Sequence, residues 1–110
     1  MQLPLEVDCL SVHQLLEDSG DVLLLDCREQ DEVEICQIRD SLWMPMREIP
    51  DELDKLQKFM QQPLVVYCHH GGRSLQVAGW LREQGFDKVQ SMSGGIDQWA
   101  TAVDPQMRRY

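Results

Sequence analysis

Short apolar segments alternate with amphipathic segments along the chain, with only a few polar residues between them. The most continuous apolar runs are DVLLLDC at 21–27 and LVVYC at 64–68, which are typical of strands covered on both faces. Shorter runs at 5–7, 41–44 and 88–92 predict further strands. Because strands and helices alternate at short intervals, the pattern predicts an α/β fold with a mostly parallel central sheet of about five strands.

The helices are predicted from apolar spacing and from the residues at their ends. A first helix is expected to begin at Ser11, where Gln14 completes a capping box, and to end at Gly20. Further helices are expected over 29–36, 51–60, 74–84 and 96–101. Gly79, inside one of these helices, is expected to let it approach the sheet closely. Residues 104–110 lack such a pattern and are expected to form a loose tail.

Composition and charge fit one ordinary globular domain, expected to span residues 1–110. The chain has 110 residues, of which 43% are hydrophobic and 26% charged. Its net charge of −9 argues against nucleic acid and anionic membranes as partners, because both attract basic patches. No apolar run approaches the ~20 residues of a membrane helix. Because MQLPLEVDCL also lacks the features of a secretory leader, a cytoplasmic location is expected.

The candidate chemistry centres on the cysteines, which are Cys9, Cys27, Cys36 and Cys68. They form no CxxC pair and no cluster with zinc-binding spacing, so neither a disulfide framework nor a bound metal is expected. Cys68 ends an apolar strand, and parallel sheets bind their ligands at the carboxyl ends of their strands. Cys27 is assigned to the core. Cys36 could act as a resolving thiol, although packing is the favoured interpretation.

The segment CHHGGRS, which begins at Cys68, has the composition of an anion-binding loop. Gly71 and Gly72 permit backbone angles that let the loop curl and aim its N–H groups inward. The start of the next helix adds free N–H groups and the positive end of its dipole. With the charge of Arg73, these surroundings predict a thiol pKa lowered from about 8.5 to roughly 3.5–7.5. Cys68 is therefore predicted to be a thiolate nucleophile, which must be reachable from solvent.

The residues expected to contact a substrate follow Cys68 directly and are His69, His70, Gly71, Gly72, Arg73 and Ser74. Arg73 is expected to bind an anion, and Ser74 to cap the helix, to donate a hydrogen bond to the site, or both. The histidines are as compatible with lining a pocket mouth as with touching substrate. The competing interpretation is a packing cysteine followed by a simple turn. That interpretation explains neither the histidines nor the arginine.

Three segments in the right order resemble the rhodanese-like domain family. CHHGGRS resembles its active-site loop, in which four residues separate the cysteine from a closing residue. DCREQDEVEICQIRDSLWMP at 26–45 is similar to a family stretch with Asp-x-Arg, a Glu and a later Pro, and MSGGIDQW at 92–99 to its C-terminal Gly-Gly and Trp. The chain departs from the family at Cys36-Gln37 and at Asp40-Ser41, where Gly-His and Gly-Ala are usual.

The resemblance implies a three-layer sandwich in which Asp26 and Arg28 are structural, with Arg28 and Glu32 placed to pair. It also implies a sulfurtransferase without a cofactor, in which Cys68 takes a sulfur atom from a donor as a persulfide. The donor would be a small anion such as thiosulfate, or a persulfide on a protein or small thiol, and the acceptor a thiol. Because the net charge repels thiosulfate, a persulfide is the favoured physiological donor.

Two other functions fit the same fold. Cysteine phosphatases and arsenate reductases that resemble it use a loop one residue longer, which encircles a tetrahedral anion, so the shorter loop of this chain favours sulfur. The second is a non-catalytic binding or redox-sensing module. Inactive rhodanese-like domains typically lack the cysteine, and the presence of Cys68 therefore favours an enzyme.

Overall fold

A single five-stranded sheet organises the computed structural model, which describes residues 2–18 and 20–110. Its strands are β1 (Glu6–Val7), β2 (Leu23–Asp26), β3 (Leu42–Trp43), β4 (Leu64–Tyr67) and β5 (Val89–Met92). They lie in the order β1-β5-β4-β2-β3, and each neighbouring pair is parallel. The predicted α/β class is confirmed. Residue 1 of the expected domain and residue 19 of the first expected helix lie outside the described residues.

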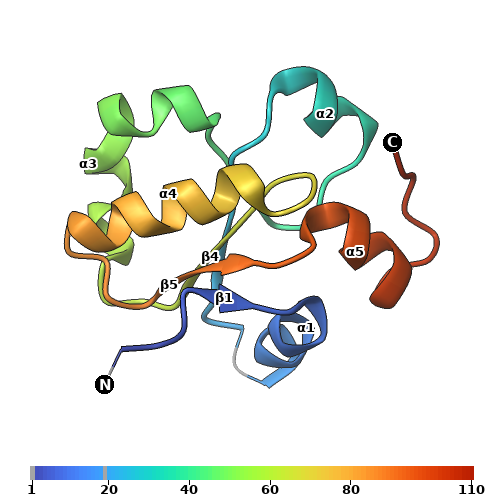
Figure 1. Cartoon of the computed structure of the whole chain (residues 1–110), viewed down its shortest axis with the longest axis horizontal. Coiled ribbons are helices and arrows are strands. Elements are labelled where there is room, and N and C mark those ends of the chain that lie inside the picture. Colours follow the sequence, from blue (N-terminus) through green and yellow to red (C-terminus); the bar gives the residue numbers. More distant parts are fainter. Residues whose placement is uncertain (1, 19) are drawn as a thin grey trace.

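Helices on both faces of the sheet complete three layers (Figure 1). They are α1 (Cys9–Asp18), α2 (Gln30–Ile35), α3 (Leu53–Leu56), α4 (Gly72–Glu83) and α5 (Gly95–Ala102). α3 and α4 lie on one side of the sheet and α1 on the other (Figure 1). The helix expected over 51–60 is divided among α3 and the short 3-10 turns Pro50–Glu52 and Gln57–Phe59. None of the described helices has the length and apolar character needed to cross a membrane.

Two local predictions about helices were wrong. α1 begins before Ser11, because the Asp8 carboxylate accepts the Ser11 N–H at 2.7 Å and is therefore the capping group. Gly79 does not mark a close approach of α4 to the sheet, since a Cβ atom there would meet nothing within 4 Å. Both errors concern a contact between a residue and its surroundings that apolar spacing does not specify.

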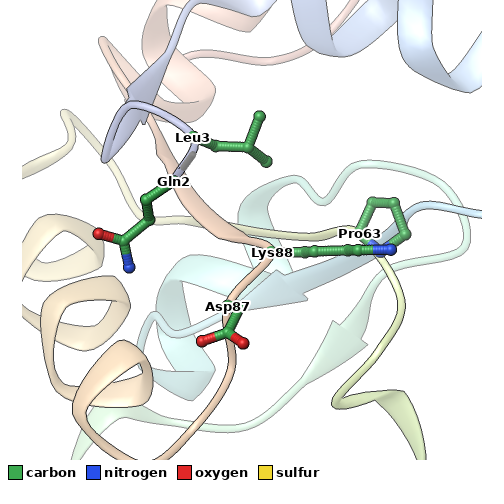
Figure 2. Close-up of a pocket in the computed structure, with 5 residues that line it drawn as sticks. All are labelled: Gln2, Leu3, Pro63, Asp87 and Lys88. Carbon is green, nitrogen blue, oxygen red and sulfur yellow. The ribbon is translucent and has the colours of Figure 1, made fainter.

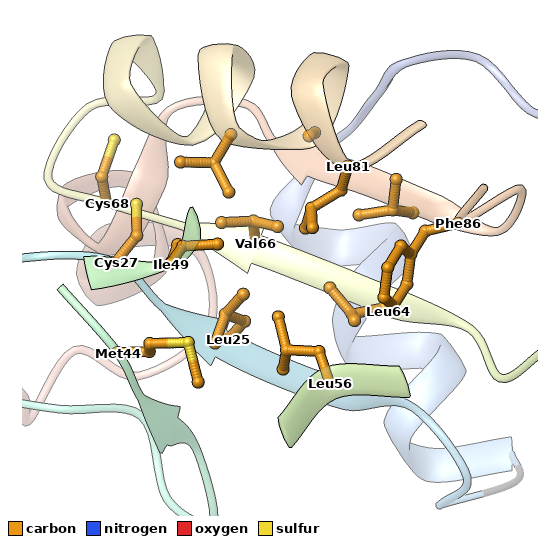
Figure 3. Packing of buried hydrophobic residues seen from close by; sticks show 13 residues of the cluster. Leu25, Cys27, Met44, Ile49, Leu56, Leu64, Val66, Cys68, Leu81 and Phe86 are labelled. Carbon is orange, nitrogen blue, oxygen red and sulfur yellow. The ribbon is translucent and has the colours of Figure 1, made fainter. Parts of the chain in front are cut away.

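The core follows the alternation of side chains along the two central strands, β2 and β4. Leu25, Cys27, Val66 and Cys68 belong to the cluster beneath α3 and α4, which Figure 3 shows in part. Val65 and Tyr67, which alternate with Val66 and Cys68 along the chain, belong to the opposite cluster, which includes residues of α1 and α5. Successive side chains of a strand point to opposite faces, so the ends of β2 and β4 place Cys27 and Cys68 on the same face.

The tail over residues 104–110 is packed against the domain and is not the loose segment expected. The Tyr110 ring stacks on His69, with 3.8 Å between ring centroids and 8° between planes. Its hydroxyl donates to the Glu32 carboxylate at 2.9 Å and accepts from the Arg28 guanidinium at 3.0 Å. The tail therefore connects α5 to α2 beside the loop that follows β4 (Figure 1).

A surface hollow lies at the other end of the sheet, and it is lined by Gln2, Leu3, Pro63, Asp87 and Lys88 (Figure 2). These residues precede β1, β4 and β5, so the hollow lies at the amino ends of the strands. Its lining includes no cysteine, serine or histidine. The candidate nucleophile Cys68 directly follows β4 and so lies at the opposite, carboxyl ends of the strands.

Candidate active site

The loop between β4 and α4 begins at Cys68 and turns sharply at Gly71. Gly71 has a φ of +110°, and a Cβ atom there would lie 3.3 Å from the backbone nitrogen of Gly94. Glycine is therefore favoured at this position both by backbone angle and by space. Gly72 has no such requirement, since it begins α4 and a Cβ atom there would meet nothing within 4 Å. The expectation that both glycines shape the loop holds for Gly71 only.

The sulfur of Cys68 lies at the centre of the curled loop. The N–H of Gly71 donates to this sulfur at 3.1 Å and the N–H of Ser74 at 3.3 Å, while the Ser74 hydroxyl lies 3.5 Å away. Hydrogen bonds from the Cys27 thiol, Ser74 and Gly71 lower the pKa of Cys68 to about 4, against the opposing effect of burial. The site therefore favours a thiolate at neutral pH.

Cys27 is buried in the core, as predicted, and it is also a part of the site, which was not predicted. Its hydrogen bond with Cys68, together with burial, raises the pKa of Cys27, so this thiol stays protonated beside a thiolate. Cys36, the residue considered as a resolving thiol, packs against the cluster on the opposite face of the sheet. The sequence did contain a signal, because Cys27 and Cys68 each end one of the two most apolar runs.

The sequence predicted that Cys68 is reachable from solvent, and the structure contradicts this prediction. The residue is only 1% exposed, so its sulfur is not open to solvent in this conformation. Its neighbour His69 carries the stacked ring of Tyr110. A reactant in solution therefore reaches the Cys68 sulfur only when the loop or the tail beside it moves.

Arg73 forms a bidentate ion pair across the site. Its two terminal nitrogens lie 2.7 and 2.9 Å from the carboxylate oxygens of Glu32 on α2. The hydrogen bond from Arg73 lowers the pKa of Glu32 to about 2. The expected pairing of Arg28 with Glu32 occurs only through the backbone oxygen of Glu32, which accepts from the Arg28 guanidinium at 3.2 Å. The carboxylate that pairs with Arg28 is that of Asp26, at 2.9 and 2.7 Å, and both side chains are fully buried. The predicted anion-binding guanidinium is thus already neutralised by a carboxylate.

The two histidines of the loop have different surroundings. The ring nitrogen of His69 lies 2.9 Å from the backbone oxygen of Tyr110, whereas the side chain of His70 is 67% exposed and lies 3.8 Å from Asp97. His69, His70 and Asp97 each offer a ligand atom within 4.8 Å of the others, a spacing that could hold a metal ion. Asp97 already pairs with Arg109 at 3.0 Å, which weakens that possibility.

The start of α5 fixes the loop from the side opposite α4. The N–H groups of Ile96 and Asp97 donate to the carbonyl oxygens of Cys68 and His69, at 2.9 and 3.1 Å. Gly95 has a φ of +61°, and a Cβ atom there would lie 2.6 Å from the carbonyl oxygen of Cys68. The second glycine of MSGGIDQW is therefore needed for this contact between the helix and the loop.

The chain belongs to the rhodanese-like domain family, whose model matches residues 10–102. A sulfurtransferase of Allochromatium vinosum is 39% identical over 95 residues, which cover 86% of this chain and 87% of the relative. A thiosulfate sulfurtransferase GlpE of Coxiella burnetii is 38% identical over 79 residues, covering 72% of each chain. The crystal structure of a rhodanese-like domain protein of Staphylococcus aureus has a TM-score of 0.80 at 23% identity, covering 96% of this chain and 97% of that one. The resemblance found in the sequence is thus confirmed.

Proposed function

We propose that this protein is a sulfurtransferase that carries a sulfur atom as a persulfide on Cys68. The observation that carries the proposal is the set of N–H donors from Gly71 and Ser74 directed at the Cys68 sulfur. Such donors stabilise a thiolate and would equally stabilise the anionic outer sulfur of a persulfide. The names of the relatives, a sulfurtransferase and a thiosulfate sulfurtransferase, support the same reaction class.

The reaction consists of two displacements at sulfur. The Cys68 thiolate attacks the outer sulfur of the donor, and the donor's S–S bond breaks. The bonding electron pair leaves with sulfite when the donor is thiosulfate, or with a thiolate when it is a persulfide. In the second step an acceptor thiolate attacks the outer sulfur and Cys68 leaves. Its pKa of about 4 makes Cys68 a good leaving group as well as a nucleophile present as thiolate.

The charges around the loop favour a persulfide over thiosulfate as the physiological donor. Three guanidinium groups near the loop are each paired with a carboxylate, in the pairs Arg28–Asp26, Arg73–Glu32 and Arg109–Asp97. Because each guanidinium is paired, these groups add little positive potential that could attract the thiosulfate dianion. The net charge of the protein, −9, repels it. A persulfide on a small thiol or on a protein does not need such a potential, and a thiol is the matching acceptor.

Location and partners follow from the same features. The four cysteines are free, and the cytoplasm is the compartment that keeps thiols reduced. We therefore place the activity in the cytoplasm, where small-thiol persulfides would be available as donors. The acidic net charge makes nucleic acid and anionic membranes unsuitable partners.

The first test measures whether sulfur is loaded onto the protein. Reduced wild-type protein is exposed to thiosulfate or to a small-thiol persulfide, and its intact mass is then recorded. We expect the wild type and the Cys36→Ser control to gain the mass of one sulfur atom and Cys68→Ser to gain none, with faster loading from the persulfide. The proposal fails if the wild type gains no sulfur, or if the serine variant gains it as well.

A further inference from the structure

The second cysteine of the site, Cys27, lies beside Cys68 because of the strand register. β2 and β4 are parallel neighbours in which Leu25 is paired with Val66 and Asp26 with Tyr67. The residue after each strand is a cysteine, and the N–H of Cys27 donates to the Tyr67 carbonyl at 3.1 Å, which continues the ladder. Cys27 and Cys68 therefore occupy adjacent positions of neighbouring strand ends.

The two side chains also point the same way. Both cysteines belong to the cluster beneath α4, and Figure 3 shows their side chains extending from the strand ends on the same side of the sheet. Neighbouring strands lie about 4.8 Å apart, and a disulfide needs a Cα separation of about 4.4–6.8 Å. Cys9 belongs to the cluster on the opposite face, and Cys36 packs against that cluster. Cys27 is thus the partner that the fold places within reach of Cys68.

We propose that Cys27 is a resolving thiol, which captures Cys68 after oxidation by a peroxide and forms a Cys27–Cys68 disulfide. The Cys68 thiolate attacks one oxygen of hydrogen peroxide, and the O–O bond breaks. Hydroxide is the leaving group, and Cys68 becomes a sulfenic acid. The Cys27 sulfur, losing its proton, attacks the Cys68 sulfur, and the S–O bond breaks to release hydroxide. The protons of Cys27 and of the solvent convert both hydroxides to water. Two cysteines are thereby oxidised and one peroxide is reduced.

The buried position of both cysteines suits this role. Cys68 is 1% exposed and Cys27 is fully buried, so a small uncharged oxidant reaches the pair more readily than a large thiol does. A sulfenic acid held against a thiol condenses to a disulfide before further oxidation to the irreversible sulfinic acid. In the resting site the Cys27 thiol lies 3.4 Å from the Tyr67 carbonyl oxygen, to which it donates, and the neighbouring Cys68 raises its pKa. Because Cys27 stays protonated, it does not compete with Cys68 as a nucleophile.

The inference depends on the reactive thiolate of Cys68 and not on sulfur transfer. The experiment therefore contains no sulfur donor and is informative whether or not sulfur is loaded onto the protein. The reduced 110-residue protein is treated with hydrogen peroxide, and free thiols are then alkylated under denaturing conditions. Intact mass and a non-reducing peptide map give the products.

In the wild type we expect the loss of two hydrogen atoms, a linked pair of peptides containing Cys27 and Cys68, and full recovery on reduction with a dithiol. The Cys36→Ser control is expected to behave in the same way. Cys27→Ser is expected to gain oxygen atoms at Cys68, and a dithiol does not recover the sulfinic fraction.

Three results would overturn the inference. The first is a wild-type map without the Cys27–Cys68 link, which needs no variant and so does not depend on how Cys27→Ser folds. The second is a link from Cys68 to Cys9 or Cys36. The third is equal protection of Cys68 from over-oxidation in Cys27→Ser and in the wild type.

Discussion

At the scale of single residues, hydrogen bonds to its sulfur stabilise the thiolate of Cys68, and the net charge of the molecule does not. The protein carries a net charge of −9, and the nearby Arg73 is engaged by Glu32. The donors that remain are N–H, O–H and S–H groups, of which Ser74 supplies two. Its hydroxyl also lies 2.8 Å from the Ser91 hydroxyl and 3.2 Å from the Gly71 carbonyl oxygen, and these contacts hold it in place.

Replacing Ser74 with alanine tests the hydroxyl separately from the N–H, which the variant keeps. A hydrogen bond to a charged group contributes about 1.5 kcal/mol at the weaker end of its range, and one pKa unit corresponds to about 1.4 kcal/mol. We therefore expect the pKa of Cys68 to rise by about one unit. The measurement is the rate of Cys68 alkylation by iodoacetamide as a function of pH.

The wild-type alkylation rate should rise with pH through a midpoint near the pKa of about 4 and then level off. In Ser74→Ala the midpoint should move to higher pH, because a lost donor disfavours the anion. Ser11→Ala, an exposed position on α1, serves as the control and should leave the profile unchanged. A Ser74→Ala midpoint equal to that of the wild type would show that the hydroxyl does not stabilise the thiolate.

At the scale of secondary-structure elements, the loop is held between the starts of two helices. α4 begins at Gly72 and directs the N–H of Ser74 at the sulfur. α5 begins at Gly95 and binds the carbonyl oxygens of Cys68 and His69 through the next two N–H groups. These contacts at both ends of the loop position the sulfur before any substrate arrives.

Two glycine-to-alanine substitutions distinguish the need for this contact from the general effect of adding a methyl group. In Gly95→Ala the new Cβ atom would lie 2.6 Å from the carbonyl oxygen of Cys68, so the loop and α5 must separate. We expect the free energy of unfolding to fall by about 2–4 kcal/mol and sulfur loading to fall at least tenfold. Denaturant unfolding and the mass assay provide the two measurements.

Gly79→Ala is the matched control, since a Cβ atom there meets nothing within 4 Å. It should stabilise the protein by up to about 1 kcal/mol, because alanine favours a helix interior more than glycine does. Sulfur loading should not change. Equal effects of the two substitutions would contradict a specific close approach at Gly95.

An element or contact could be predicted when residues that are neighbours in sequence specify it. The apolar runs at 21–27 and 64–68 predicted β2 and β4, and the residues after Cys68 predicted a loop that surrounds the sulfur. The pair formed by Glu32 and Arg73 joins residues 41 positions apart in sequence, so no local pattern specifies it. Cys27 lies between these cases, because aligning the ends of the two apolar runs would have placed it beside Cys68.

At the scale of the whole molecule, the tail over 104–110 connects α5, the loop and α2. Its contacts were not predictable from apolar spacing because they are polar and aromatic and reach distant parts of the sequence. The Tyr110 hydroxyl binds a carboxylate 78 positions away, on Glu32. Its ring covers His69, the residue that follows the almost fully buried Cys68. The tail therefore stabilises the conformation in which the sulfur is enclosed.

Releasing the tail should make Cys68 more accessible, and two substitutions of Tyr110 separate its contacts. Tyr110→Ala removes both the stacking on His69 and the hydroxyl, whereas Tyr110→Phe keeps the ring and removes only the hydrogen bonds with Arg28 and Glu32. We expect iodoacetamide to alkylate Cys68 severalfold faster in Tyr110→Ala than in the wild type, with Tyr110→Phe between them. The rates are compared at about pH 7, well above the lowered pKa, so that a change in ionisation does not contribute. If Tyr110→Ala reacts no faster than the wild type, the enclosure of Cys68 is a property of the loop alone, and the tail has no part in controlling access to it.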